Sequence, residues 1–322
     1  MNLQHVLQNF KRHGFANAGQ LALTRGEADE LANLSNHAFA AVRDACATGE
    51  KHPDYLPSTS GLEGVMRIPQ QHPRIAELLD KIVSNGEVRA LLGDVLGPDY
   101  KIWQANFRRS IPGDKGLYLH QDGRGETNLC ILLSSNPSGA GATVFLPGSH
   151  LVKSSMKKWR IEAPPILLRW LSFLFTPLTG AAGDIAFFSN RTWHGRARNP
   201  SAQSFDVILI SFFPAGVAFG FKGYGDWSPK FLTSLQGTRL GVLIDPTIGT
   251  RQRSDGLYEI LPSGKGSIQE SPFALAIDDG QIPRAGVGGV NLLLTIAILR
   301  SVFAVGRPLW HLVRNFFPRG TR

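Results

Sequence analysis

The chain has 322 residues, of which 43% are apolar and 18% are charged, and its net charge is +9. The composition excludes an intrinsically disordered chain, and the length suffices for one large domain or two small ones. The basic balance favours an anionic partner, such as nucleic acid, anionic lipid or an acidic substrate.

Residues 1–100 are predicted to be mostly helical. Thr24 and Glu27 have the spacing of a capping box, in which each side chain bonds the backbone N–H of the other residue. Apolar residues at helical spacing follow this box. The same periodicity predicts a helix over 75–83 and another over 88–96, which Gly97 and the following proline end.

From residue 101 the pattern changes to short apolar or alternating runs separated by Gly, Pro, Asn and Ser. Such runs are typical of a β-sandwich or jelly roll, so we place a β-core at 101–215. An insertion at 151–182 begins basic and ends apolar. Its prolines and Arg169 argue against a membrane span and favour a lid or a surface-inserting segment that contains Trp170.

The remainder, 216–322, is predicted to be loop-rich up to a helix over 290–317. In this predicted helix, arginines recur every seven residues among aliphatic and aromatic side chains. The spacing places Arg300, Arg307 and Arg314 near one helical face beside Trp310. This pattern favours an interfacial helix on anionic lipid. A helix packed on the domain or at a dimer interface, with its arginines in water, is the alternative.

Two cysteines, Cys46 and Cys130, are too few for a disulfide framework, and we expect both to be reduced thiols in a reducing compartment. The first residues contain no long apolar run, so we expect no secretory signal. These two observations favour a cytoplasmic location.

The run LYLHQDGRG places His120 and Asp122 two residues apart after a strand-like segment, where side chains at this spacing share a face. His194, at the end of GDIAFFSNRTWHG, is the candidate third ligand. Two histidines and one carboxylate that leave other metal positions open are expected of non-haem Fe(II) oxygenases. Taken alone, the His-x-Asp pattern is equally consistent with a hydrogen-bonded pair in a loop.

Three motifs in order, HQD at 120–122, PGSH at 147–150 and WHG at 193–195, resemble the phytanoyl-CoA dioxygenase family over residues 100–215. The resemblance implies a mostly β fold with flanking helices, a double-stranded β-helix of the jelly-roll or cupin-like kind, across a single domain of residues 1–322. It also implies Fe(II) as the metal, 2-oxoglutarate and O₂ as co-substrates, and ascorbate as an optional extra. The carboxylate in the triad favours hydroxylation over halogenation, and the histidine of PGSH is expected to be structural.

The family usually places an arginine about ten residues beyond the distal histidine to bind the far carboxylate of 2-oxoglutarate. This chain has none there. Other basic residues are therefore the candidates for this contact, together with two amides where the family often places polar contacts: Arg108, Arg109, Arg196, Arg198, Gln104 and Asn106. An arginine fits because its guanidinium binds a carboxylate with two hydrogen bonds. A solvated strand edge explains the adjacent pair at 108–109 equally well.

We therefore expect a dioxygenase that hydroxylates an amphiphilic, anionic lipid or lipid-linked sugar as a peripheral enzyme of the inner membrane, with the Kdo sugar of lipopolysaccharide as the leading candidate. The alternatives are a hydroxylase of a soluble small molecule or acyl-CoA, and a non-catalytic jelly-roll binding protein. Nucleic acid is not expected as a partner, because the basic residues lie among aliphatic runs rather than exposed stacking aromatics. A homo-oligomer stays open.

Overall fold

The computed structural model describes residues 3–47, 52–56, 61–120, 126–151, 160–161, 174–214, 227–244, 250–252 and 258–260. All of these lie in the first of the two units into which the chain divides, residues 1–281 and 282–322. The helix predicted at 290–317 therefore lies outside the described residues. Among the residues that are described, no helix is long and apolar enough to cross a membrane.

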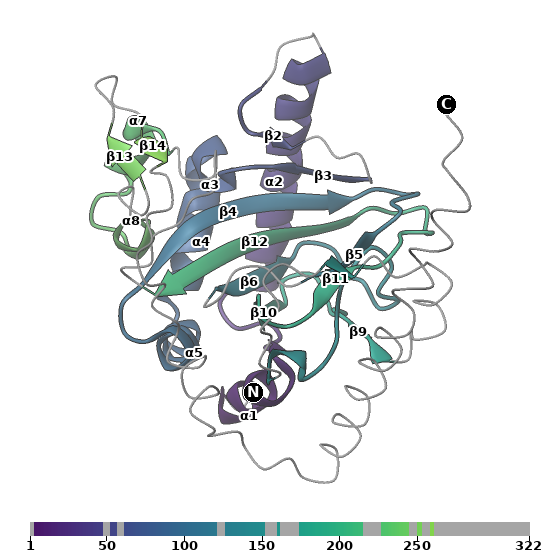
Figure 1. Cartoon of the computed structure of the whole chain (residues 1–322). Coiled ribbons are helices and arrows are strands. Elements are labelled where there is room, and N and C mark those ends of the chain that lie inside the picture. Colours follow the sequence, from purple (N-terminus) through teal and green to yellow (C-terminus); the bar gives the residue numbers. More distant parts are fainter. Residues whose placement is uncertain are drawn as a thin grey trace. The chain divides into compact units, whose positions relative to one another are not determined.

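A seven-stranded antiparallel sheet is the largest feature of the fold (Figure 1). Its strands, in spatial order, are β1 (Phe15–Asn17), β10 (Ile185–Ser189), β6 (Thr127–Leu132), β12 (Phe205–Pro214), β4 (Tyr100–Ser110), β3 (Leu62–Val65) and β2 (Tyr55–Leu56). β6 and β12 are central and apolar, and every residue of β6 is buried. A central strand covered on both faces explains why its sequence lacks polar alternation.

A second, five-stranded antiparallel sheet faces the first and completes the jelly roll, as predicted. Its spatial order is β8 (Arg160–Ile161), β5 (Leu117–His120), β11 (His194–Arg196), β7 (Thr143–Phe145) and β9 (Thr176–Pro177). The two short edge strands β8 and β9 come from the segment that the sequence predicted as an insertion. Phe145 packs against Phe188 of the large sheet, with ring centroids 5.2 Å apart, and so joins the two sheets.

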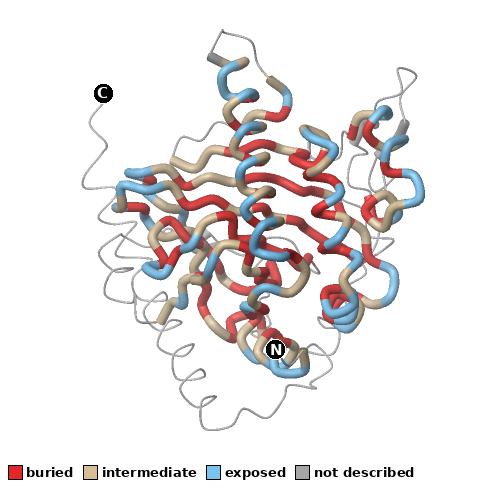
Figure 2. The backbone as a smooth tube through the Cα atoms, turned by 180° about the vertical axis from the view of Figure 1, so that it is seen from behind, coloured by how far each residue is buried: buried red, intermediate tan, exposed pale blue. Residues whose placement is uncertain are grey.

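Helices cover the other face of the large sheet. They are α1 (Leu3–His13), α2 (Arg25–Ala47), α3 (Ile68–Gln71), α4 (Pro73–Ser84) and α5 (Gly86–Leu96), followed late in the chain by α7 (Pro229–Ser234) and α8 (Arg239–Leu243). Their apolar faces and the facing side chains of the sheet form the main core. Figure 2 shows buried residues along the strands and on the inner faces of these helices, with exposed residues on the outer faces.

Alternation along β4 separates this core from the site. Ala105 and Phe107 point into the helix-covered core, while Gln104, Arg108 and Ser110, on the opposite face, line the space between the sheets. The position of the polar site therefore follows from the period-two pattern of one strand.

The helix predictions in the N-terminal region are confirmed. Thr24 N–H donates to Glu27 Oε2 at 2.8 Å and Glu27 N–H donates to Thr24 Oγ1 at 3.3 Å, which is the predicted capping box. The helices predicted at 75–83 and 88–96 are α4 and α5, and Gly97 follows α5 with φ +88°. A small hairpin of β13 (Thr250–Gln252) and β14 (Tyr258–Ile260) lies in the predicted loop-rich region.

Candidate active site

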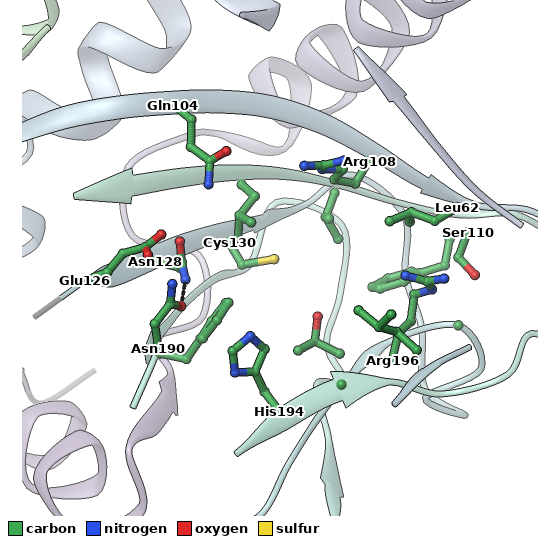
Figure 3. Close-up of a pocket in the computed structure, with 18 of the residues that line it drawn as sticks. Leu62, Gln104, Arg108, Ser110, Glu126, Asn128, Cys130, Asn190, His194 and Arg196 are labelled. Atoms are coloured by element: carbon green, nitrogen blue, oxygen red, sulfur yellow. Dashed lines mark hydrogen bonds between the residues drawn. The ribbon is translucent and has the colours of Figure 1, made fainter. Parts of the chain in front are cut away.

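A cavity of about 410 Å³ lies between the two sheets. Both sheets supply its walls: β11 contributes residues 194–196, and β4, β6 and β12 contribute the side chains opposite (Figure 3). Cys130 lines the middle of this cavity, and burial raises the pKa of its thiol to about 12. It therefore stays a neutral thiol at physiological pH.

His194 lies at the first position of β11, is 7% exposed and lines the cavity. Its Nδ1 lies 2.8 Å from the backbone oxygen of Thr192. Because a carbonyl oxygen only accepts, Nδ1 carries a proton, and Nε2 is the ring nitrogen left to bind a metal. A metal-binding histidine is held in the same way, by a carbonyl that fixes the tautomer and orients the ring.

His120 ends β5, and the strand register pairs it directly with His194. The two predicted histidines, 74 residues apart in the chain, are therefore backbone neighbours on adjacent antiparallel strands. Asp122 lies outside the described residues. Among the residues that are described, no group of three His, Cys, Asp or Glu side chains is placed to hold a metal.

One end of the cavity is basic. Arg108 and Arg196 line it together with Ser110 (Figure 3). Arg196 donates to both carboxylate oxygens of Asp114, at 2.6 and 3.0 Å. Burial alone would raise the pKa of Asp114, but hydrogen bonds from Arg196, Ser110 and the N–H of Gly116 outweigh it and lower that pKa. The carboxylate is therefore ionised and offsets the charge of Arg196.

The other end is lined by amides and one carboxylate. Gln104, Asn128, Asn190 and Glu126 meet there, and the indole N–H of Trp103 donates to Glu126 at 3.4 Å (Figure 3). Glu126 is only 5% exposed. We refer to these two regions as the basic end and the amide end.

The residues predicted for co-substrate binding fall into two groups. Gln104 and Arg108 line the cavity. Asn106 is buried on the same face of β4 and donates to Gln104 at 2.8 Å, and Arg198 is exposed; neither lines the cavity. Arg109 points to the helical side, where it pairs with Asp206 at 2.7 Å. The residues predicted for membrane or substrate contact lie outside the described residues: Trp170, Arg300, Arg307, Trp310 and Arg314.

The sequence did not single out Glu126, Asn128 or Asn190. Their signal was weak: Glu126 and Asn128 are two residues apart at the start of β6, so they share a face. His150 is structural, as expected, because it is fully buried and its Nε2 donates to the backbone oxygen of Lys11 at 3.1 Å. Cys46 and Cys130 are both free thiols, also as expected.

The family model for phytanoyl-CoA dioxygenase (PhyH) matches residues 13–204. No curated protein matches the chain significantly. Solved structures do resemble it. AviO1 from Streptomyces viridochromogenes Tue57 is 20% identical, with 67% of this chain and 96% of that chain covered and a TM-score of 0.51.

Two further structures were solved with bound molecules. EctD from S. alaskensis, with 2-oxoglutarate and 5-hydroxyectoine, is 16% identical over 66% of this chain and 76% of that chain, at a TM-score of 0.52. The epimerase SnoN, with Fe³⁺, α-ketoglutarate and nogalamycin RO, is 16% identical over 70% and 90% of the two chains, also at 0.52. At these identities the likeness establishes the shared fold.

Proposed function

The chain belongs to the phytanoyl-CoA dioxygenase family, whose model covers more than half of its length, and from that premise we propose that His120, Asp122 and His194 hold a catalytic Fe(II). Membership makes the protein a non-haem iron, 2-oxoglutarate-dependent oxygenase. The observation that carries the ligand assignment is His194, which faces the cavity with Nδ1 bonded to a carbonyl and lies opposite His120 in the sheet.

These residues fit iron on chemical grounds. A neutral imidazole with a fixed Nε2 lone pair is a suitable ligand, and cross-strand partners share a face of a sheet. Asp122 follows His120 by two residues and would supply the carboxylate. When bound, the metal supplies the oxidising chemistry, in which 2-oxoglutarate and O₂ give succinate and CO₂ while a substrate C–H becomes C–OH.

Arg108 is the proposed anchor for the far carboxylate of 2-oxoglutarate. The family's usual arginine position falls at the start of β12, where Phe205 and Val207 line the cavity instead. Arg108 is the register partner of Val207 on β4, so it brings a guanidinium to the same end from the next strand. Arg196, whose charge is offset by Asp114, contributes less.

For the substrate we propose a small molecule, or the exposed sugar of a lipid-linked molecule, that carries polar groups. The amide end supports this, because an aliphatic chain there would leave buried polar groups without partners. The Kdo sugar of lipopolysaccharide is the first molecule to test. A soluble metabolite is the alternative, in line with EctD and SnoN, whose structures contain 5-hydroxyectoine and nogalamycin RO.

Association with the inner membrane is part of the proposal and rests on sequence alone. The arginines and aromatic residues of 290–317, together with the apolar part of 151–182, have the composition of segments that lie on anionic lipid. A lipid-linked substrate would then be reached from the membrane surface.

Anaerobic titration with Fe(II) and 2-oxoglutarate tests the function. The wild type should develop the charge-transfer absorption band of an iron–keto acid complex, because the keto oxygen and the adjacent carboxylate of 2-oxoglutarate would chelate the metal. His194→Ala and Asp122→Ala should abolish the band, while His37→Ala, an exposed histidine on α2, should keep it. A wild type without the band would overturn the iron and co-substrate assignment. Succinate release in air then serves to screen candidate substrates.

A further inference from the structure

A continuous chain of buried hydrogen bonds runs under the amide end of the cavity. It starts at the backbone N–H of Arg67, which donates to Asn106 Oδ1 at 3.1 Å. Asn106 donates to Gln104 at 2.8 Å, and Gln104 donates to Ser211 Oγ at 2.7 Å. From there the chain continues through two amides, from Ser211 to Asn128 and from Asn128 to Asn190.

The first member fixes the direction of every later bond. A backbone N–H can only donate, so the amide oxygen of Asn106 must accept and its NH₂ must donate onward. Gln104 must likewise accept with its oxygen and donate with its NH₂ group. Ser211 then accepts from Gln104 and donates its hydroxyl proton to Asn128. Asn128 and Asn190 therefore each accept with oxygen. The orientation of five side chains is determined by one peptide group.

Asn190 is the last member: its side-chain oxygen accepts from Asn128, and its NH₂ group donates to none of the described residues. The side chain lines the cavity from the loop after β10, near His194 (Figure 3). The relay therefore delivers a hydrogen-bond donor to the cavity wall. Glu126, whose backbone oxygen accepts the N–H of Asn190 at 3.0 Å, places an acceptor carboxylate in the same end.

The start of the relay is itself constrained. Arg67 is a non-glycine residue with φ +52°, and its buried side chain pairs with buried Asp54. A left-handed backbone at such a residue costs on the order of 1 kcal/mol or more and persists only where the surroundings impose it. The ion pair holds this conformation, and the conformation aims the N–H at Asn106.

The co-substrate does not account for this donor. Gln104 and Arg108 are four residues apart on β4, about 13 Å along the strand, whereas the five carbons of 2-oxoglutarate span about 5 Å. A co-substrate anchored at Arg108 leaves the amide end to another molecule. The described lining of the amide end contains no basic side chain, so a neutral group suits it better than an anionic one, and a hydroxyl oxygen can accept from the NH₂ group of Asn190.

We propose that Asn190 is a substrate-positioning residue whose NH₂ donates to a hydroxyl oxygen of the substrate, and that the buried relay from Arg67 holds it in that orientation. The inference rests on the proposed function and narrows its substrate class to molecules that bear hydroxyl groups. It also identifies Ser211, which does not line the cavity, as a residue that acts through Asn190.

The test uses full-length protein loaded with Zn(II) and 2-oxoglutarate, and two probes followed by saturation-transfer difference NMR. The probes are cis-1,2-cyclohexanediol and cyclohexanecarboxylate. Asn190→Asp keeps the oxygen that Asn128 needs and replaces the donor by an acceptor. Ser211→Ala removes one link of the relay at a distance from the cavity. Asn136→Asp, at a buried amide outside the cavity, is the matched control.

The diol should bind the wild type and Asn136→Asp, and bind Asn190→Asp and Ser211→Ala roughly tenfold more weakly. In Ser211→Ala the melting temperature should fall by a few degrees, because Gln104 and Asn128 each lose a buried hydrogen-bond partner, while the 2-oxoglutarate affinity from the iron charge-transfer band should change little. The inference is overturned if the diol does not bind the wild type, if the carboxylate binds better, or if Ser211→Ala weakens 2-oxoglutarate instead. Loss of the iron band in the wild type would instead contradict the proposed function.

Discussion

The protein departs from its family in the side chains that could bind the far carboxylate of 2-oxoglutarate. The far carboxylate of the co-substrate needs a guanidinium, yet β12 offers only Phe205 and Val207 at that end. Arg108 reaches the same end from β4, beside Ser110, and Arg196 is held by Asp114. The positive charge that β12 lacks at this end is thus available from Arg108 on the neighbouring strand β4.

Replacement of Arg108 by Gln should weaken 2-oxoglutarate binding by roughly ten- to a hundredfold, since a charge-assisted bidentate bond contributes about 1.5–3 kcal/mol. The charge-transfer band measures this affinity without substrate. Arg198→Gln is the matched control, because this exposed side chain does not line the cavity. The opposite outcome, a loss in Arg198→Gln alone, would move the anchor to Arg198, another of the arginines that the sequence offered as candidates.

His150 makes stability depend on pH. Burial is the main cause that lowers its pKa to about 4 from the usual 6.5, opposed by its hydrogen bond to Lys11. The unfolded chain binds a proton there below pH 6.5 while the folded chain does not, so stability falls as pH drops from about 6.5 to about 4. Above that window this histidine contributes no pH dependence.

His150 lowers the free energy of unfolding by at most about 3 kcal/mol at low pH, as the difference between its folded and unfolded pKa values indicates. Urea unfolding at several pH values should show a flatter dependence in His150→Gln than in the wild type. His37→Gln, on the exposed face of α2, should keep the original slope. An unchanged slope in His150→Gln would show that other groups dominate acid destabilisation.

The sequence indicated the candidate ligands because the spacing of a motif can be read without a structure. His194 was recognisable from WHG after a Gly-Asp strand, and it does face the cavity. The amide relay was not recognisable, because Gln104, Asn128 and Ser211 come together only through the register of β4, β12 and β6. Register is a tertiary property, so residues far apart in the chain share a network that no local pattern reveals.

At the scale of elements, long helices were predictable and short strands were not. α2, α4 and α5 have caps and several turns of periodicity. β1, β2 and β3 have two to four residues each, too few for an alternating pattern, and they extend the large sheet from within the region predicted as helical. α7 and α8 were missed for the same reason, although Ser228 and Thr238 cap them.

The capping box of α2 also ties two helices together. Glu27 accepts from Thr24 and from Lys81 of α4, at 2.6 Å, and the hydrogen bond from Lys81 is the main cause that lowers its pKa to about 2. Thr24→Ala should lower the free energy of unfolding by about 1 kcal/mol, measured by urea denaturation. Thr233→Ala, at an exposed hydroxyl inside α7, should change it far less. Equal losses would show that the cap has no special role.

The catalytic fold and the basic C-terminal segment that is proposed to bind membrane belong to different units of the molecule. Both hydrophobic cores of the described residues are built from side chains between Val6 and Ile244. The arginines at 300, 307 and 314 belong to the second unit, 282–322. We therefore expect catalysis and membrane binding to be separable by mutation.

Deletion of 288–322 should leave the iron charge-transfer band and the melting temperature unchanged while strongly reducing sedimentation with vesicles that contain phosphatidylglycerol. A full-length chain with Arg300, Arg307 and Arg314 replaced by Gln keeps the apolar residues and isolates the charge. Each arginine near an anionic surface contributes on the order of 1 kcal/mol, so this variant should bind roughly a hundredfold more weakly at low salt. Added salt should reduce wild-type binding, because it screens surface charge. If both variants bind vesicles as the wild type does, the basic helix has another role, and packing on the domain or on a second copy becomes the better explanation.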